Sequence, residues 1–457
     1  MTKRLSLLLI ACGLAAALLV PAGAGASTPI PGQYIVVLKG GATGHSVAAE
    51  HARSAGARVI HTYDAALHGY AARLSADGLA KVKADPRVAS VTQDVEGRPL
   101  LAQTLPTGVN RIDADLSTQL AGDGQGAVDG SVAIYDSGID TLHPDLNVVG
   151  GVNCLGALSS TNDGTIEDRY GHGTHVAGIV GAKDDANGVV GVAPGVRLYS
   201  VRDVDSIGSG TLSGQLCGIN WITDNGPALG IKVVNSSQVL LTGRGDDGNC
   251  GYSNGDVAHQ AICRSTAAGI TWVFGAGNNG SVSFTNGAGP SYPEVLTVTA
   301  MGDGNGVPNV PTTSTFSCGS AISFSTGPSN KKNSSASTTT ETDDKYTSFS
   351  SYATSTRATE VNHTVAAPGA CIWSTFKGQT YGYLTGTSMA APHGTGTVEL
   401  CIVSGQCTGT PAQIIQKIRA DAAGWNAANP FYGFTGDPLH APVSGRYYGY
   451  LLRPGLY

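Results

Sequence analysis

The sequence predicts an α/β fold, a parallel sheet with helices on both faces, preceded by a small ferredoxin-like α+β module. The first observation is length, because 457 residues exceed the usual size of one domain and more than one folding unit is expected. The second is a change of pattern. From about residue 131, short apolar runs alternate with helical stretches, as is typical of parallel strands joined by crossover helices.

The smaller module is predicted within residues 27–101. Short apolar runs indicate its strands, and two helical stretches lie between them, the first closed by Gly56. We expect strands at 33–38, 67–74 and 88–95, and helices at 47–57 and 76–83. This order fits a ferredoxin-like unit, which by itself indicates no particular function.

The larger module is predicted over residues 102–457. We expect strands at 132–135, 197–201, 233–235, 271–276 and 295–300, with helices at 212–225 and 256–268. In such sheets ligands bind beyond the carboxyl ends of strands, so functional residues are expected there. A Ser/Thr-rich insertion near 302–346 interrupts the pattern, and its residues 323–342 are expected to form a long exposed loop. The tyrosine-rich C-terminal stretch is expected to pack back onto the module.

The N-terminus has the composition of an export signal. Lys3 and Arg4 precede the apolar stretch Leu5–Val20, and Ala24-Gly25-Ala26 is a small-residue cleavage site. A membrane anchor is the weaker interpretation because the stretch is short for a spanning helix. A lipoprotein signal at Cys12 is a minor alternative. We therefore expect residues 1–26 to be a signal peptide. The protein is expected to be secreted and extracellular, and not attached to a membrane after processing.

Charge and cysteine content limit the function classes. The net charge of −6 is mild and argues against a general nucleic-acid binder. Removing Cys12 with the signal leaves an even number of cysteines, which favours disulfides in an exported chain. The connectivity cannot be derived from the sequence. By proximity alone we expect Cys401–Cys407 and Cys250–Cys263, which leaves Cys154–Cys217 and Cys318–Cys371.

Three segments place a reactive side chain in a Gly-rich turn. Asp136 ends the apolar run that begins at Val132, His172 lies in 171–178, and Ser388 lies in 386–393. A serine hydroxyl is a weak nucleophile that needs an adjacent base, and the base needs a third group to orient it. Small flanking residues allow a peptide backbone to approach the serine. A helix beginning at the serine would also direct its backbone N–H toward a developing oxyanion.

In the order Asp, His, Ser, these segments resemble the subtilisin-like family of serine proteases, in its secreted bacterial form. The resemblance implies that Asp136 orients His172, that His172 is general base and then acid, and that Ser388 is the nucleophile. It also implies that Asn278 completes the oxyanion hole, within Gly275-Ala276-Gly277-Asn278. Residues 30–101 resemble the family's inhibitory propeptide. The predicted activity is hydrolysis of peptide bonds through an acyl-enzyme.

The resemblance also predicts how substrate and partners bind. Gly208-Ser209-Gly210 matches the segment that pairs with an extended peptide, and Ser237, Gln238 and Val239 would face it. The expected partners are polypeptide substrates and the chain's own propeptide as an inhibitor, with the enzyme a monomer. No cofactor is expected to be required for catalysis. Structural calcium is a hypothesis, for which the candidate ligands are Asp140, Asp145, Asp246 and Asp247.

Several blander interpretations compete with these assignments. His172 and His175 could be a metal pair, but they lack a carboxylate partner at helical spacing, and we expect His175 and His393 to be structural. Gly251-Tyr252-Ser253-Asn254-Gly255 fits the G-x-S-x-G pattern of α/β-hydrolases. That pattern requires an apolar strand before it, whereas a polar turn precedes it here. We therefore interpret it as a loop bounded by a disulfide.

Two departures from the family pattern predict altered efficiency. Val239 stands where the family usually has Gly, and would narrow a rim that the substrate backbone passes. Gly394 and Gly396 lie inside the helix after Ser388 and cost about 1 kcal/mol each relative to Ala. Glu399 in the same helix would need a partner or a raised pKa if buried. These residues favour the alternative of a catalytically weak or silent homologue that acts as a binding scaffold.

The junction between the modules predicts a maturation site. Leu100-Leu101-Ala102-Gln103 joins them. Family propeptides end in the active site like a product, and an apolar residue before the cut suits an apolar first pocket. We therefore expect autocatalytic cleavage near Leu101–Ala102.

Overall fold

The computed structural model describes residues 28–40, 43–96, 103–156, 162–280, 282–308, 314–318 and 340–457. The chain divides into two compact units, one ending at Leu100 and the other beginning at Leu101. The predicted signal peptide, the predicted cleavage site and most of the predicted 323–342 loop lie outside the described residues. Within the described residues, no helix combines the length and apolarity needed to cross a bilayer.

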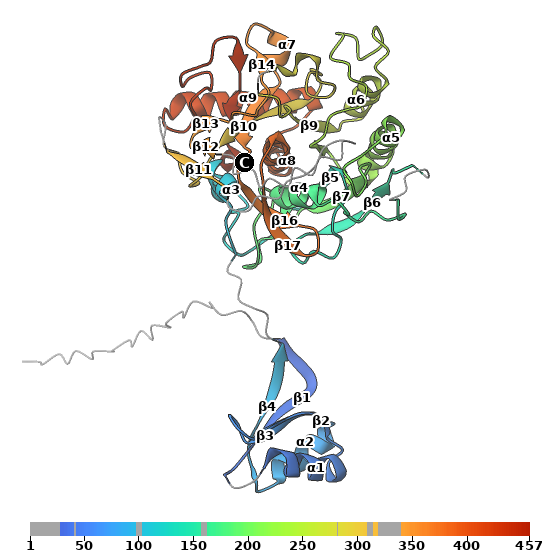
Figure 1. The fold of residues 1–457 in the computed structure, drawn as a ribbon, viewed down its shortest axis with the longest axis vertical. Helices are drawn as coiled ribbons and strands as arrows, with labels where there is room; N and C mark the ends of the chain where they lie inside the picture. Colours follow the sequence, from blue (N-terminus) through green and yellow to red (C-terminus); the bar gives the residue numbers. More distant parts are fainter. Residues whose placement is uncertain are drawn as a thin grey trace, which may run out of the picture. The chain divides into compact units, whose positions relative to one another are not determined.

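The N-terminal unit is a four-stranded antiparallel sheet with two helices (Figure 1). Its elements are β1 (Thr28–Leu38), α1 (Gly44–Ser54), β2 (Arg58–Tyr63), β3 (Gly69–Arg73), α2 (Ala76–Ala84) and β4 (Val88–Glu96). The chain order βαββαβ and the sheet order β2-β3-β1-β4 are those of the expected ferredoxin-like module. Its core includes Val36, Val47, Tyr70 and Val82. β2 was not predicted, because it is an edge strand whose side chains are mostly exposed and lack an apolar run.

The larger unit is built on a mostly parallel sheet with the order β19-β15-β10-β9-β8-β5-β7-β6. These strands are β5 (Ser131–Asp136), β6 (Val148–Asn153), β7 (Arg197–Arg202), β8 (Val233–Ser236), β9 (Thr271–Gly275), β10 (Leu296–Gly302), β15 (Thr364–Pro368) and β19 (Tyr450–Leu451). Every predicted strand of this module is present. β6 and β15 were missed because VVGGVN is interrupted by glycines and TVAAP ends in proline.

The helices cover both faces of this sheet. They are α3 (Thr107–Arg111), α4 (His172–Gly181), α5 (Leu212–Leu229), α6 (Val257–Ala267), α7 (Ala358–Val361), α8 (Thr387–Val403) and α9 (Pro411–Ala428). Alternate residues of one strand separate the two faces. Val132 and Ile134 of β5 join a core with residues of α4 and α8, whereas Ala133 and Tyr135 join a core with residues of α5 and α6. Figure 1 shows α5 and α6 together, apart from α4 and α8.

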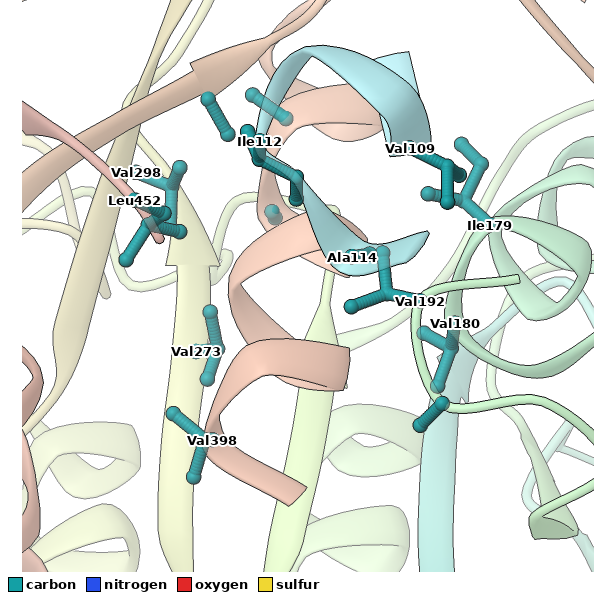
Figure 2. Packing of buried hydrophobic residues seen from close by; sticks show 14 of the residues in the cluster. Val109, Ile112, Ala114, Ile179, Val180, Val192, Val273, Val298, Val398 and Leu452 are labelled. Atoms are coloured by element: carbon teal, nitrogen blue, oxygen red, sulfur yellow. The ribbon is translucent and has the colours of Figure 1, made fainter. Parts of the chain in front are cut away.

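The core on the α8 side is rich in valine and alanine. Figure 2 shows Val398 of α8 next to Val273 of β9, and Val298 of β10 next to Leu452, within one buried cluster. Val109 of α3 and Ile179 of α4 extend the same cluster. This packing sets α4 and α8 against each other and against the strands, so their N-terminal ends are held by a fully buried core.

The remaining segments support this frame. They are β11 (Thr315–Ser317), β12 (Thr340–Thr342), β13 (Lys345–Tyr346), β14 (Ala353–Thr354), β16 (Ile372–Phe376), β17 (Thr380–Leu384), β18 (Arg446–Tyr447) and short 3₁₀ turns at Ala114–Leu116, Phe284–Asn286 and Pro454–Leu456. The described edges of the predicted insertion pair as β11 and β12. Tyr432, Tyr448 and Tyr457 are buried, which confirms that the C-terminal stretch packs onto the unit. All four expected disulfides form, including Cys154–Cys217 and Cys318–Cys371.

Candidate active site

A buried carboxylate and a histidine are paired at the carboxyl end of the sheet. Asp136 is the last residue of β5, and His172 is the first residue of α4. The His172 Nδ1 atom lies 2.8 and 2.9 Å from the two carboxylate oxygens of Asp136. The Ser137 backbone N–H also donates to Asp136 (2.7 Å). Because Nδ1 bonds to Asp136, a proton exchanged with a nucleophile would pass through Nε2.

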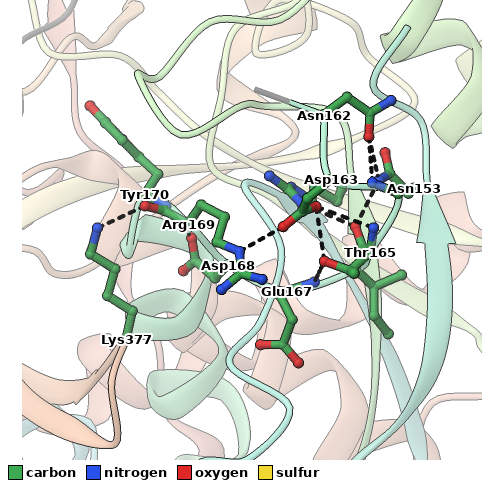
Figure 3. A network of polar contacts seen from close by, with 12 residues as sticks. Asn153, Asn162, Asp163, Thr165, Glu167, Asp168, Arg169, Tyr170 and Lys377 are labelled. Carbon is green, nitrogen blue, oxygen red and sulfur yellow. Dashed lines mark hydrogen bonds and ion pairs between the residues drawn. The ribbon is translucent and has the colours of Figure 1, made fainter. Parts of the chain in front are cut away.

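A second buried carboxylate, Asp168, holds this pair in place, and the sequence analysis did not identify it. Asp168 accepts hydrogen bonds from the Gly171 and Thr174 backbone N–H groups (2.6 and 2.8 Å), which fixes the start of α4. It also accepts from the Ser137 hydroxyl (2.9 Å), which connects α4 to the end of β5. Figure 3 shows Asp168 within the polar loop that leads into α4.

The rest of this loop is held by ion pairs and hydrogen bonds (Figure 3). Asp163 pairs with Arg169 (2.7 Å) and with the fully buried Arg202 of β7 (2.6 Å). Lys377 donates to the Arg169 carbonyl (2.7 Å). The loop therefore joins β7 to the β16–β17 turn and presents His172 from a supported backbone.

The glycines on either side of His172 are required by close approach. Gly171 has φ +110°, and a Cβ there would lie 2.4 Å from the Phe376 ring. A Cβ on Gly173 would lie 2.2 Å from the Gly138 carbonyl oxygen. The Gly-His-Gly sequence thus lets the start of α4 touch the end of β5. The imidazole and the Asp136 carboxylate meet for this reason.

The charge around His172 favours its protonated form. Burial alone lowers the pKa of the imidazole, but the charge of Asp136 and its hydrogen bond outweigh burial, with a further contribution from Asp168. The net result is a pKa of His172 raised above its usual value. A general base with a raised pKa binds the proton of a nucleophile more readily.

Ser388 is the second residue of α8 and is joined to the end of β8. Its Oγ donates to the Ser237 carbonyl (3.1 Å), and the Ser237 hydroxyl donates to the Ser388 carbonyl (2.8 Å). Ser237 also accepts from Asn235 of β8 (2.8 Å). Since α4 packs against α8, Ser388 and His172 both begin helices that share one interface.

Asn278 lies beside the start of α8 with its amide oriented. The Asn278 Oδ1 atom accepts from the Thr387 backbone N–H (2.8 Å) and hydroxyl (3.0 Å). The Thr387 hydroxyl in turn accepts from the Gly277 N–H (3.0 Å). With its oxygen anchored by two donors, the exposed Asn278 side chain directs its Nδ2 group away from Thr387. A Cβ on Gly386 would lie 3.2 Å from this Nδ2 atom, so the donor faces the backbone just before Ser388.

The glycine segment before Asn278 follows β9 directly. Gly275 is its last strand residue, and a Cβ there would lie 2.9 Å from the Thr387 carbonyl oxygen. The Ala276 N–H donates to the Val298 carbonyl of β10 (2.9 Å). The segment therefore approaches α8 as closely as backbone atoms allow, which holds Asn278 against Thr387.

The two predicted peptide-binding segments lie after β7 and β8. Gly210 forms an antiparallel bridge with Val204, and the Asp205 carboxylate accepts the Ser209 N–H (2.9 Å) within the turn that contains Gly208. In the other segment, Gln238 turns inward and donates to both oxygens of the buried Asp203 (2.9 Å each). Val239 is 58% exposed, so its side chain forms part of the surface.

Helix α8 is packed more tightly than its helix propensity suggests. A Cβ on Gly394 would lie 2.8 Å from the Val298 side chain, and one on Gly396 would lie 2.6 Å from that of Val192. The glycines therefore allow close packing, which offsets their propensity cost. Glu399 is buried, accepts the Ser131 N–H (2.8 Å), and burial raises its pKa to about 7. The sequence analysis expected a buried Glu399 to have either a partner or a raised pKa, and it has both.

The competing residues have other environments. His175 Nε2 lies 3.0 Å from the Ile372 and Gly382 carbonyls, and burial lowers its pKa to about 3. His393 Nδ1 lies 2.8 Å from the Met389 carbonyl within α8. Both are fully buried, which fits a structural role. Ser253 lies in the turn before α6, where its N–H donates to Asp247 (2.8 Å), and no strand leads into that turn.

The candidate calcium ligands differ in how far their oxygens are already used. Asp140 accepts two backbone N–H groups on one oxygen and a third on the other. Asp247 accepts four, which, against the effect of burial, lowers its pKa to about 2. Asp246, Asp247 and His259 have potential ligand atoms within 4.8 Å of one another. Asp145 alone of the four predicted ligands has a buried oxygen without a partner, and burial raises its pKa to about 7.

Comparison with known proteins places these features in a family. The sequence profile described as "Subtilase family" matches residues 129–435, and that of "Peptidase inhibitor I9" matches residues 33–98. Subtilisin DY of Bacillus licheniformis is 34% identical over 333 residues, covering 72% of this chain and 95% of that protein. Subtilisin E of Bacillus subtilis (strain 168) is 33% identical over 365 residues, covering 79% and 77%.

A solved structure of a related fold agrees with this assignment. A cold adapted subtilisin-like serine proteinase of known crystal structure aligns with 76% of this chain and 97% of its own, with a TM-score of 0.50 and 22% identity. This likeness confirms the predicted subtilisin-like α/β fold. The profile matches and the identity to the subtilisins confirm the predicted family and the predicted propeptide module. The chain therefore belongs to the subtilase family of serine endopeptidases and carries an inhibitor I9 module at its N-terminal side.

Proposed function

We propose that this chain is an exported endopeptidase in which Asp136, His172 and Ser388 form the catalytic triad. The observation that carries the proposal is the bond between His172 Nδ1 and both oxygens of Asp136 (2.8 and 2.9 Å). It leaves Nε2 as the atom that takes the Ser388 proton. The serine hydroxyl, which rests on the Ser237 carbonyl, rotates toward His172 for attack.

The chemistry then follows in two steps. Ser388 Oγ attacks the scissile carbonyl while its proton passes to His172, and the imidazolium gives that proton to the leaving amine to form the acyl-enzyme. In the second step water attacks the acyl-enzyme, His172 takes the proton of the water and returns it to Ser388 Oγ, and the carboxylic acid product is released. The Asn278 Nδ2 group and the Ser388 backbone N–H donate to the oxyanion in both steps. The orientation of Asn278 by Thr387 supports this assignment, because the amide needs no rearrangement when charge develops.

Substrate is proposed to bind as an extended strand between segments 208–210 and 237–239, with Gly275, Ala276 and Gly277 beside the reacting carbonyl. The inhibitor I9 module acts as an intramolecular inhibitor of the same cleft. Autocatalytic cleavage near Leu101–Ala102 releases it after the signal peptide has been removed. The apolar residue before this cut supports the assignment.

We also propose that a structural calcium ion is held at Asp145. Calcium prefers carboxylate and carbonyl oxygens. The Asp145 side chain supplies a buried oxygen without a partner, and its other oxygen accepts the Val189 N–H (2.9 Å). The Gln103 amide, which reaches the Lys183 carbonyl (2.9 Å) and the Val189 carbonyl (3.5 Å), is beside the same loop. Bound there, the ion would neutralise the carboxylate and tie the loop 183–189 to the segment between β5 and β6.

The decisive test is covalent labelling with a serine-directed fluorophosphonate. Mature wild-type protein should be labelled once, at Ser388, and Ser388→Ala should not be labelled and should lose about 10⁶ in kcat, a magnitude that comes from a subtilisin relative. The matched control is Ser253→Ala, which removes the serine of the G-x-S-x-G turn and should be labelled like the wild type. Absence of label on correctly processed protein would favour the silent scaffold instead.

Maturation is tested separately. N-terminal sequencing of secreted wild-type protein should begin near Ala102, whereas Ser388→Ala should remain joined to its propeptide. A mature N-terminus before residue 90 or after residue 112 would contradict the proposed site.

A further inference from the structure

Asp203 is a buried carboxyl beside the proposed catalytic aspartate, and the triad does not use it. It follows β7 directly, and its backbone N–H donates to the Asp136 carbonyl (3.1 Å), which continues the β5–β7 ladder by one residue. Asp203 is 1% exposed. The carboxyl is therefore at the functional edge of the sheet but is too deeply buried to contact a peptide itself.

Gln238 connects Asp203 to the peptide-binding segment 237–239. Its Nε2 group donates to both oxygens of Asp203 (2.9 Å each). The preceding residue, Ser237, exchanges two hydrogen bonds with Ser388. One side of the segment is thus tied to the nucleophile and the other side to a buried carboxyl.

The other bonds that hold this segment are neutral. Gln215 of α5 donates to the Val239 carbonyl (2.9 Å) and accepts the Leu241 N–H (2.8 Å). Among side-chain hydrogen bonds to residues 237–239 in the described chain, only that between Gln238 and Asp203 includes an ionisable group. Among these bonds, the one between Gln238 and Asp203 is therefore the one whose strength can change with pH.

We propose that Asp203 positions segment 237–239 through Gln238, so that protonation of this one carboxyl sets how well an extended peptide binds. Asp203 is a positioning residue and takes no part in bond cleavage. The inference rests on the proposed function only in treating residues 237–239 as peptide-binding.

The surroundings of Asp203 set the direction of the effect. Burial raises the pKa of its carboxyl to about 8, against the hydrogen bond from Gln238 and with support from the charge of Asp136. The titratable or charged groups around it are Tyr135 and Asp136 from β5, His172 behind Asp136, and Arg202, which pairs with Asp163. The first three turns of α5, Leu212–Trp221, carry no charged side chain.

Ionisation should tighten the segment. A hydrogen bond to an ionised acceptor is roughly twice as strong as one to a neutral acceptor. Gln238 is therefore held more firmly once Asp203 loses its proton. We expect the KM for an extended peptide to fall by about threefold to fivefold between pH 7 and pH 9.

The experiment compares two substrates across this pH range. An extended peptide can pair with segment 237–239 along its backbone, whereas a single-residue ester has no backbone with which to form this pairing. Mature wild-type enzyme should show the alkaline fall in KM with the peptide only. Asp203→Asn, which cannot ionise, and Gln238→Leu, which removes the connection, should both show a flat KM, while the His172 inflection in kcat remains. The matched control is Asp303→Asn, which removes another buried carboxyl whose pKa is raised to about 7 and should keep the fall.

Two results would overturn the inference: an equal fall in KM with the ester, or an unchanged fall in Asp203→Asn. If Asp203→Asn does not fold, the contrast between peptide and ester in the wild type decides alone. The proposed function fails separately, by absence of turnover of both substrates. In that case calorimetric binding of the peptide to processed wild-type protein, which would not turn it over, with and without Asp203→Asn, still tests the pH dependence of Kd.

Discussion

Asp136 and Asp203 end up side by side at the carboxyl edge of the same sheet, and their partners make them different. Asp136 faces the imidazole of His172, which becomes positively charged when it takes a proton. Asp203 faces the neutral amide of Gln238, and burial raises its pKa to about 8. Burial is nearly complete for both carboxyls. The role of a buried carboxyl is therefore set by whether its partner can carry the opposite charge.

Replacing Asp136 should have the larger effect on chemistry. We expect Asp136→Asn to lower kcat by about 10⁴, because the amide cannot hold the His172 tautomer or stabilise the imidazolium. Since Asp136 raises the pKa of His172, and only neutral His172 can act as base, the fall in kcat at low pH should move to lower pH in the variant. Steady-state kinetics from pH 5 to 9 measure both. Equal losses in kcat for Asp136→Asn and Asp203→Asn would remove the distinction between the two carboxyls.

Asn278 tests the donor side of the same site. Asn278→Ala should lower kcat by about 10²–10³ with little change in KM, a magnitude that comes from the equivalent donor in a subtilisin. The matched control is Asn254→Ala, whose amide donates to Gly245 in the turn before α6 and should leave kcat within about twofold. A loss that appears in KM instead would mean that Asn278 binds the ground state.

Asp145 offers a third environment, in which a buried oxygen has no protein partner. If calcium supplies the missing charge, calcium at one hundred times its Kd should raise the free energy of unfolding by about 2.7 kcal/mol. A chelator should remove this stabilisation. Thermal melts with chelator and with added calcium measure this. Asp145→Asn should lose the response and Asp140→Asn, whose oxygens accept backbone N–H groups, should keep it. An unchanged melting temperature in the wild type would count against the ion.

The dependence of stability on pH gives the most specific contrast. An aspartate in the unfolded chain ionises near pH 3.9. Native Asp203 holds its proton to about pH 8, so the native state binds more protons between these values, and its stability falls as pH rises. The slope is at most about 1.4 kcal/mol per pH unit, and the cost is complete above pH 8. Urea unfolding at pH 5, 7 and 9 should show a flatter dependence for Asp203→Asn. If Asp203→Asn has the same pH dependence of stability as the wild type, the Asp203 carboxyl is not the source of that dependence.

Much of the fold could be predicted from the sequence, because strands buried on both faces of a parallel sheet have continuous apolar runs. The runs at β5, β8 and β9 were predicted within one or two residues of their observed ends. Strands with exposed or glycine-rich sequences gave no such run, and β2 and β6 were missed for that reason. For the helix after Ser388, the sequence predicted a weakness that the structure offsets. Propensity assigns a cost to Gly394 and Gly396, but their close contacts with Val298 and Val192 depend on neighbours far away in sequence.

The sequence by itself predicted the proposed reactive residues, because a candidate nucleophile, base and orienting acid each lie in a short glycine-rich motif. It also indicated the family, whereas the pairing of the cysteines was expected only from proximity and was established by the structure. Only the tertiary structure decided how Asp168 supports His172, why Asn278 is oriented, and that Gln238 turns inward to Asp203. The physical reason is that the direction and charge of a buried polar side chain depend on which groups other strands and helices bring within hydrogen-bond distance. No local pattern in the sequence records that distance.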